Sequence, residues 1–135
     1  MAVAFGLYRA WVDGRFAGTH RVKGSVDASE PSTGQMLAEH DLEHGLGERA
    51  TLLQFSSAFC APCRATRRVL GDVTSVTAGV VHVEVDAEHH LELVRRLGIL
   101  RTPTTLILDS AGREVTRAAG APTKAQVLAA IAALP

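Results

Sequence analysis

The sequence predicts an α/β domain in which a mixed central β-sheet is flanked by helices on both faces. Strand and helix patterns follow one another through the C-terminal two thirds of the chain, in the order strand, helix, strand, helix, strand, strand, helix. Strands separated by helices favour parallel neighbours, and the close pair near the end favours a hairpin. A chain of 135 residues is long enough for about one domain.

The first strand and the first helix of this series surround the only two cysteines of the chain. Residues 51–56 form a short apolar run bounded by polar residues, which predicts a buried strand. Residues 64–76 hold apolar side chains at roughly helical spacing, which predicts a helix. Cys60 and Cys63 lie between the two, so we expect Cys60 at the N-terminus of the helix.

The next strand and helix are predicted from alternation and from end signals. Residues 79–85 alternate valines with other residues and are rich in β-branched side chains, as strands are. Asp86 is expected to cap a helix that continues to about Arg96 and ends at Gly98.

Two strands and a helix complete the domain. Residues 104–108 are an apolar strand, and a glycine-containing turn leads from it into a strand at 113–118. Thr123 and Gln126 stand three residues apart, the spacing of a capping box, which predicts that a helix occupies residues 124–134.

The two cysteines have C-x-x-C spacing, and their position gives this motif a chemical meaning. Free backbone N–H groups and the helix dipole at a helix N-terminus favour a thiolate over a thiol at Cys60. Cys63 falls on the same face of the helix three residues later and can close a disulfide with Cys60. The motif therefore predicts a redox-active pair.

Other interpretations of the cysteine pair are open but weaker. A structural disulfide with a two-residue gap closes almost no loop, so its entropic stabilisation would be small. A zinc site needs about four ligands, and neither His82 nor the pair His89 and His90 stands at a recognised spacing from the cysteines. The two residues could also be inert thiols.

Four local motifs of the chain occur together in one known family. They are Phe59-Cys60-Ala61-Pro62-Cys63 after a strand, Val85-Asp86 closing the next strand, the segment 98–104 with Pro103, and Gly120 after the last strand. In this order and at these separations, residues 51–134 resemble the thioredoxin superfamily. The resemblance implies the thioredoxin fold and a thiol–disulfide exchange activity.

The resemblance also implies a substrate groove beside the disulfide. In the family the proline at position 103 is cis and faces the disulfide, and the preceding residue, here Thr102, offers its backbone to an extended substrate strand. The groove residues implied are Phe59, Ala61, Pro62, Thr102, Pro103 and Gly120. Arg101 is expected either to attract acidic partners at the rim of the groove or to be a solvated loop residue.

Several positions depart from the usual pattern of the family. Phe59 replaces a tryptophan and Ala61 a glycine, whereas Pro62, which accompanies strongly reducing members, is retained. Gln54 stands where the family has a buried aspartate that moves the proton of the second cysteine. His82, aligned through Asp86, stands where the family has a lysine beneath the site.

These departures suggest a different route for the proton of Cys63. A thiol has an ordinary pKa of about 8.5, whereas the imidazole of His82, with one of about 6.5, suits a general base near neutral pH. Our hypothesis is that His82 accepts this proton, directly or through one water, and that Gln54 orients the imidazole. The alternative is a buried, neutral His82, with the proton passing to solvent.

The charge balance and cysteine content of the chain limit the partners that we expect for it. Fourteen basic and fourteen acidic residues balance, and no basic stripe with interleaved aromatic residues is present, which argues against nucleic acid. Both cysteines belong to the motif, which suits a reducing compartment. We therefore expect a cytoplasmic monomer with no metal and no cofactor besides its disulfide. Its expected partners are protein disulfides and a thioredoxin reductase or another electron donor.

The first 34 residues are predicted to be an N-terminal segment and linker, and residues 35–135 the thioredoxin-like domain, with a short first strand at 35–42. Residues 1–8 are apolar but too short to span a bilayer, which needs about 20 residues. The tryptophan and arginines that follow resemble the cytoplasmic end of a membrane helix, as in membrane-anchored actinobacterial members of the family. The segment is thus either the remnant of an anchor that begins upstream or a frayed amphipathic end.

Two functions follow from these observations. The first is a thiol–disulfide oxidoreductase that reduces protein disulfides through Cys60 and Cys63. The second is a non-catalytic binding module in which the C-x-x-C motif is a metal half-site or a relic. The joint presence of Pro62 and the Thr102-Pro103 pair favours the enzyme, because a docking module needs neither.

Overall fold

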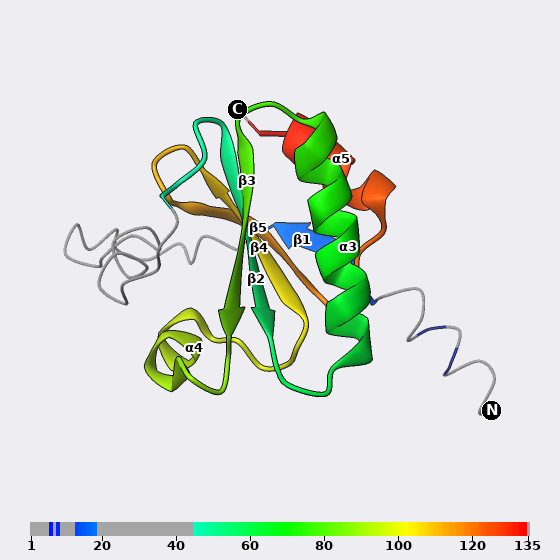
Figure 1. The fold of residues 1–135 in the computed structure, drawn as a ribbon, viewed down its shortest axis with the longest axis vertical. Helices are drawn as coiled ribbons and strands as arrows, with labels where there is room; N and C mark the ends of the chain where they lie inside the picture. Colours follow the sequence, from blue (N-terminus) through cyan, green and yellow to red (C-terminus); the bar gives the residue numbers. More distant parts are fainter. Residues whose placement is uncertain (1–5, 7, 9–12, 19–44, 135) are drawn as a thin grey trace.

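The computed structural model describes residues 6, 8, 13–18 and 45–134, which contain a five-stranded mixed sheet with helices on both faces (Figure 1). The strands are β1 (Phe16–Gly18), β2 (Ala50–Ser56), β3 (Val80–Asp86), β4 (Thr104–Asp109) and β5 (Glu114–Ala119), and the helices are α3 (Ala61–Val76), α4 (Leu91–Leu97) and α5 (Lys124–Ala132). The strand order is β1-β5-β4-β2-β3. The predicted fold class is confirmed. The strand expected at 35–42 lies outside the described residues.

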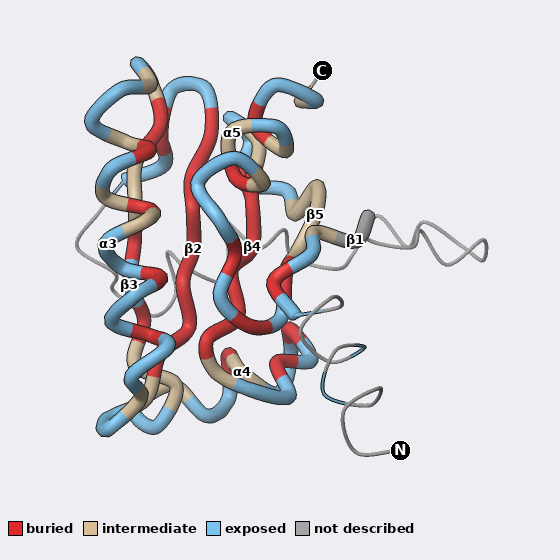
Figure 2. The backbone as a smooth tube through the Cα atoms, turned by 90° about the vertical axis from the view of Figure 1, so that its right-hand side faces the viewer, coloured by how far each residue is buried: buried red, intermediate tan, exposed pale blue. Residues whose placement is uncertain are grey.

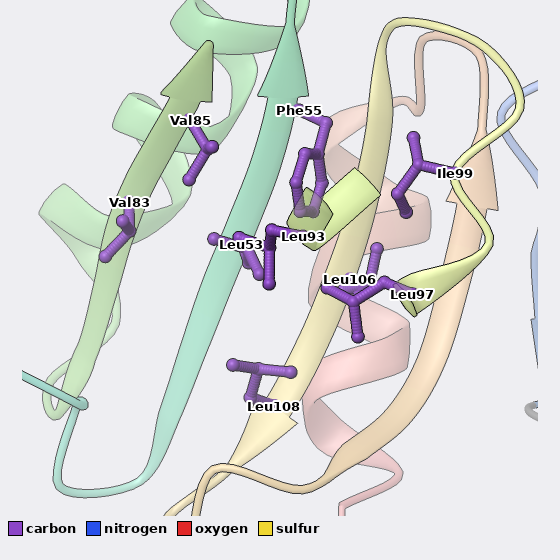
Figure 3. Packing of buried hydrophobic residues seen from close by; sticks show 9 residues of the cluster. All are labelled: Leu53, Phe55, Val83, Val85, Leu93, Leu97, Ile99, Leu106 and Leu108. Carbon is purple, nitrogen blue, oxygen red and sulfur yellow. The ribbon is translucent and has the colours of Figure 1, made fainter. Parts of the chain in front are cut away.

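Two apolar clusters, one on each face of the sheet, hold the layers together. Helix α4 covers one face, where the cluster consists of Leu53, Phe55, Val83, Val85, Leu93, Leu97, Ile99, Leu106 and Leu108 (Figure 3). Helices α3 and α5 cover the other, where it consists of Ala50, Leu52, Leu70, Val73, Val80, Ile107, Val127 and Ile131. Each fully buried leucine or phenylalanine stabilises the fold by about 1.5–3 kcal/mol. Because both faces are covered, every residue of β2 is buried (Figure 2).

The strand directions follow the prediction at two places and depart from it at one. Strand β2 is parallel to β3 across α3, and β4 and β5 form the expected antiparallel pair. Strand β4, however, is antiparallel to β2 and is not a neighbour of β3, although α4 separates β3 from β4. A helix of seven residues, such as α4, spans only about 10 Å, whereas a strand of seven residues such as β3 spans about 23 Å. The chain therefore turns back at the end of β3, and β4 runs in the opposite direction.

The start of α4 differs from the prediction, whereas its end agrees. Asp86 does not cap the helix, which begins five residues later at Leu91. The Asp86 carboxylate instead accepts the backbone N–H of Glu88 at 2.9 Å and pairs with His89 Nδ1 at 2.9 Å. These local bonds close a turn, so the chain remains non-helical there. Gly98 ends the helix with a φ of 66°, as predicted for a left-handed C-cap.

The N-terminal segment contributes a strand to the sheet. Residues 16–18, which the sequence places in the segment 1–34, pair antiparallel with β5 as β1. Without β1, strand β5 would present an unpaired edge of N–H and C=O groups. The sheet therefore does not begin at the predicted boundary of residue 35.

No helix among the described residues is long and apolar enough to cross a bilayer. Most residues of the predicted anchor segment lie outside the described part of the chain.

Candidate active site

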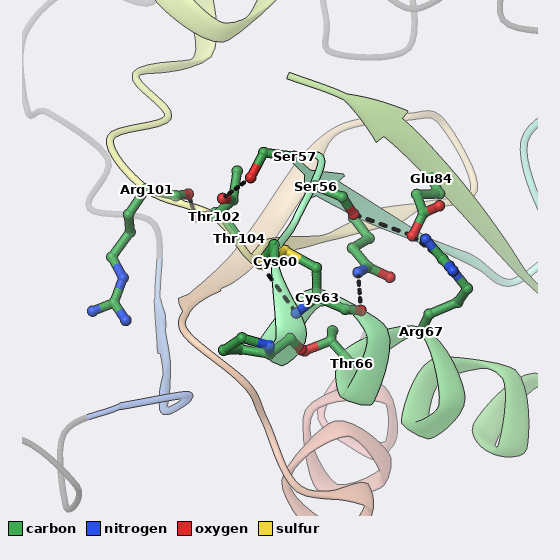
Figure 4. Close-up of a disulfide and its surroundings, with 12 residues drawn as sticks. Ser56, Ser57, Cys60, Cys63, Thr66, Arg67, Glu84, Arg101, Thr102 and Thr104 are labelled. Carbon is green, nitrogen blue, oxygen red and sulfur yellow. Dashed lines mark hydrogen bonds and ion pairs between the residues drawn. A yellow bond between two sulfur atoms is a disulfide. The ribbon is translucent and has the colours of Figure 1, made fainter. Parts of the chain in front are cut away.

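The two cysteines form a disulfide at the turn between β2 and α3 (Figure 4). Cys60 is the N-cap of α3, and its sulfur accepts the backbone N–H of Cys63 at 3.2 Å. Pro62 stands in the first turn of the helix, where its missing N–H costs nothing. Cys60 is half-buried, whereas Cys63 is only 1 % exposed. The two sulfurs therefore differ in access from solvent.

A second loop is joined to the loop before the cysteines and holds the proline singled out by the sequence. The Thr102–Pro103 peptide bond is cis. Thr102 Oγ1 lies 2.9 Å from Ser57 Oγ, so a hydrogen bond joins this loop to the loop that leads into the cysteines (Figure 4). The carbonyl of Pro103 accepts the N–H of Gly120 at 2.8 Å. Three separate turns of the chain thus meet at one end of the sheet.

Phe59, immediately before Cys60, has an unusual backbone and an exposed ring. Its φ is 60°, in the left-handed region that non-glycine residues rarely adopt. Such a conformation costs a non-glycine residue roughly 1–2 kcal/mol. The side chain is fully exposed. The fold therefore holds a large apolar ring in solvent beside the disulfide.

Gln54 and His82 lie together beneath the cysteines. Gln54 is completely buried on β2, and its Nε2 donates to the carbonyl of Cys63 at 2.9 Å. Its Oε1 lies 2.9 Å from His82 Nε2 on β3. Because a carbonyl only accepts, the amide nitrogen must face Cys63 and its oxygen must face His82. His82 Nε2 therefore carries a hydrogen, and the lone pair of the neutral imidazole lies on Nδ1.

A charged pair lies close enough to His82 to influence its protonation. Arg67 on α3 binds the carboxylate of Glu84 at 2.9 Å, and the same oxygen accepts the hydroxyl of Ser56 at 3.1 Å (Figure 4). Burial of the imidazole lowers the pKa of His82 below its ordinary value of 6.5, the Glu84 carboxylate opposes this shift, and the Arg67 guanidinium adds to it. The neutral form of His82 is favoured in the folded protein.

Thr105 is a polar residue at this site that the sequence analysis did not select. It is the β4 residue directly opposite Gln54, it is completely buried, and its hydroxyl has no hydrogen-bond partner among the residues that the structure describes. The alternation of β4 could have indicated it, since Thr105 shares the α3 face with Ile107. An unpaired hydroxyl beside Gln54 adds to the polarity of the layer under Cys63.

Asp13 is another residue that sequence reasoning missed. Its carboxylate binds Arg101 Nη1 at 2.9 Å, and both side chains are about half exposed. It also lies against Gly120, where a Cβ would come within 3.0 Å of the Asp13 Cγ and where φ is 92°. The two partners of the ion pair are 88 residues apart in sequence, so no local signal predicts their contact.

The histidines considered as metal ligands are bound to other partners than the cysteine sulfurs. His89 pairs with Asp86 beyond the end of β3, and His82 binds Gln54. In the part of the chain that the structure describes, no group of three or more His, Cys, Asp or Glu side chains is arranged to hold a metal ion.

The fold and the cysteine site define a class of protein. A C-x-x-C disulfide at the N-terminus of a helix, on a βαβ unit of a mixed sheet, is the site of a thiol–disulfide oxidoreductase. Residues 42–135 match the model of the family described as a thioredoxin-like domain, and the chain belongs to that family.

Individual relatives agree with this assignment. Thioredoxin of Alicyclobacillus acidocaldarius subsp. acidocaldarius is 33% identical over 87 residues, which cover 64% of this chain and 82% of the relative. Human thioredoxin domain-containing protein 2 is 36% identical over 72 residues, which are 51% of this chain but only 13% of the human protein. The chain therefore corresponds to a small part of that longer relative.

Solved structures show the same fold. Thioredoxin f from spinach chloroplast superposes with a TM-score of 0.57 at 26% identity, covering 64% of this chain and 77% of that one. Thioredoxin of Malassezia sympodialis superposes with a TM-score of 0.56 at 21% identity, covering 75% of this chain and 84% of that one. At the latter identity the likeness concerns the fold alone.

Proposed function

We propose that this protein reduces disulfides of other proteins, with Cys60 as the attacking nucleophile and Cys63 as the resolving thiol. The observation behind this assignment is the unequal exposure of the two residues, since Cys60 is half-buried at the helix N-terminus and Cys63 is 1 % exposed. A nucleophile must reach its substrate, whereas a resolving thiol has only to reach its neighbour. The backbone N–H of Cys63 already points at Cys60 Sγ, where a thiolate would form.

The reaction begins with the reduced dithiol and proceeds by two exchanges. The Cys60 thiolate attacks one sulfur of the substrate, which forms a mixed disulfide and expels the other substrate sulfur as a thiolate that takes up a proton. Cys63 then loses its proton and attacks Cys60 Sγ, which forms the Cys60–Cys63 bond and releases the second substrate sulfur. Two electrons pass to the substrate. A thioredoxin reductase or another electron donor then supplies two electrons that reduce the Cys60–Cys63 disulfide to the dithiol.

The substrate is proposed to lie in an extended conformation along the loop before Pro103. Phe59, Ala61 and Pro62 are exposed on one side of the disulfide, and Thr102 is partly exposed on the other. The backbone of Thr102 would pair with the substrate strand, and the buried residues Pro103 and Gly120 would form the bottom of the substrate groove. Arg101 contributes less to acidic preference than its charge suggests, because Asp13 pairs with it.

We propose that Gln54 and His82 assist the deprotonation of Cys63. In this proposal Gln54 fixes the imidazole through its Nε2, and the proton of Cys63 passes to Nδ1, directly or through one water. In the alternative, the pair positions the carbonyl of Cys63 and the proton passes to solvent. Both are consistent with a neutral His82, which its lowered pKa favours.

We propose that the protein works in a reducing compartment. Two cysteines confined to the motif support a reducing compartment such as the cytoplasm. We also propose that the protein is a monomer.

The experiment that tests this function is capture of the mixed disulfide. Cys63→Ser should accumulate a covalent complex with a protein disulfide substrate such as insulin, because the second exchange cannot occur, and Cys60→Ser should accumulate none. The complex is read on a non-reducing gel, and turnover by the unmodified protein is read as insulin turbidity with dithiothreitol as donor. The reverse pattern of capture would contradict the assignment, and no turnover would contradict the function.

A further inference from the structure

The segment before β1 lies against the rim of the proposed substrate groove. The N–H of Gly14 donates to the carbonyl of Ala119 at 2.8 Å, so the segment is bonded to the end of β5. A Cβ on Gly14, whose φ is 74°, would come within 2.2 Å of the carbonyl oxygen of Ala121. A glycine is therefore needed for the two stretches of backbone to approach this closely. This approach places Asp13 beside Gly120, one of the groove residues.

Asp13 lies between the two loops that carry the groove residues. A Cβ on Gly120 would come within 3.1 Å of Asp13 Oδ1, and the same oxygen binds Arg101 Nη1 at 2.9 Å. Figure 4 shows the side chain of Arg101 extending toward the N-terminal segment, which is drawn in blue. Arg101 directly precedes Thr102, and the N–H of Gly120 donates to the carbonyl of Pro103 at 2.8 Å. The Asp13 carboxylate is thus part of the rim.

We propose that Asp13 determines which substrate charges this site accepts. Its carboxylate occupies the place beside Arg101 that an acidic side chain of the substrate would otherwise take, and it thereby prevents a preference for acidic polypeptides. This inference rests on the proposed function, in which the substrate strand pairs with Thr102 next to Arg101. Asp13 takes no part in the exchange of disulfides and acts only on the choice of substrate.

The backbone holds Asp13 in this position independently of its ion pair. Both side chains of the pair are about half exposed, and exposed ion pairs contribute little to stability. The hydrogen bond of Gly14 to Ala119 keeps the carboxylate near Arg101 whether or not a substrate is present. An acidic substrate must therefore compete with a carboxylate of the same chain, whose effective concentration is high. A neutral substrate meets no such competitor.

The test uses pairs of synthetic peptides with one disulfide, in which glutamate or its uncharged isostere glutamine stands at the same position. This position is moved in turn one to four residues from either cysteine, and the ratio of kcat/KM for glutamate to that for glutamine is taken at each. In the unmodified protein every ratio should be near one. In Asp13→Asn the highest ratio should rise about three- to fivefold, the factor that an exposed ion pair contributes to an equilibrium. Because the ratio is taken within each variant, a general loss of activity cancels.

Further variants show whether Arg101 is responsible for the change. The double variant with Asp13→Asn and Arg101→Gln should return to a ratio near one, because the cation that attracts the glutamate is gone. The matched control is Asp72→Asn, which removes the same charge from an exposed position of α3 and should leave every ratio near one. In about 1 M salt, where the Debye length is about 3 Å, the ratio in Asp13→Asn should also fall toward one.

Three results would overturn the proposal. They are a ratio of three or more in the unmodified protein, no change of the ratio in Asp13→Asn, and a gain that persists in the double variant.

A binding measurement separates this proposal from the proposed function. Peptides with both cysteines replaced by serine are added to the oxidised full chain, and the Nε–Hε resonance of Arg101 is followed by NMR. The glutamate peptide should shift this resonance in Asp13→Asn but not in the unmodified protein. If no disulfide peptide is reduced, the proposed function has failed, and this comparison alone then decides the role of Asp13. Equal shifts in the two proteins, or a shift in neither, would contradict that role.

Discussion

The two faces of the sheet are built from the same strands but differ in chemistry. On the α4 face, β2 contributes Leu53 and Phe55 to a cluster that is entirely apolar. On the α3 face, the same strand contributes Leu52 to an apolar cluster, then Gln54, which binds the carbonyl of Cys63, and Ser56, which binds Glu84. The alternation of a strand allows this division, because successive side chains point to opposite faces. One face stabilises the fold, and the active-site end of the other holds polar groups within reach of Cys63.

Among changes that test this difference, the largest loss of stability is expected when a polar side chain is placed on the apolar face. Leu53→Gln places an amide among apolar side chains at a completely buried position. We expect a loss of at least about 3 kcal/mol in the free energy of unfolding, since apolar burial is lost and the amide has no partner there. Urea unfolding at neutral pH measures this loss. A loss below 1 kcal/mol would show that the α4 face tolerates polar groups.

The converse change, Gln54→Leu, should have a smaller effect. Gln54 is as completely buried as Leu53, but the Gln54 amide makes two hydrogen bonds, to the carbonyl of Cys63 and to His82. We expect a loss of about 1–2 kcal/mol, because the added apolar surface offsets part of what the unpaired groups cost. The same urea experiment compares the two variants directly. If Gln54→Leu lowers the free energy of unfolding more than Leu53→Gln does, the α4 face is not the one that depends on apolar packing.

The smallest of these effects concerns pH. Burial lowers the pKa of His82 below 6.5, so the unfolded chain binds a proton more tightly than the folded one. Between the two pKa values the unfolded state holds more protons, and stability therefore rises with pH. The contribution is fully present above about pH 6.5 and is lost as the pH falls through the lower, folded-state value. His82→Gln should remove this part of the slope when urea unfolding is repeated from about pH 7.5 down to 5.

The rate of disulfide reduction by the same variant separates the two roles of His82. If the imidazole receives the proton of Cys63, the pH–rate profile of the unmodified protein has a limb near the lowered pKa of His82, and this limb is missing in His82→Gln. If the two profiles coincide while the stability slopes differ, His82 acts only in holding Gln54. Equal stability slopes in the two proteins would contradict its burial in the neutral form.

Local sequence signals predicted much of the fold and the cysteine site. The capping box of Thr123 and Gln126 is present, with both of its hydrogen bonds. Gly98 ends α4 in the left-handed conformation, and Cys60 caps α3. Each of these features depends on atoms within about four residues of one another, so the residue types alone are sufficient to specify them.

Asp86 shows where local signals are ambiguous. A carboxylate before an apolar run suits a helix cap, yet the same oxygens suit the turn that Asp86 forms with Glu88 and His89. The sequence is compatible with both arrangements. The packing of Leu93 and Leu97 under the sheet fixes which residues can be helical and thereby selects the turn.

What the sequence by itself determined is the series of elements from β2 to α5, the cysteine pair and the polar residues Gln54 and His82 near it, but not strand β1. Only the tertiary structure decided that β4 runs antiparallel and that Asp13 pairs with Arg101. It also decided which atom of His82 bears the hydrogen, because that depends on Gln54 facing Cys63 from another strand. These features join residues far apart in the chain, and their contacts exist only once the sheet has set the distances between the strands.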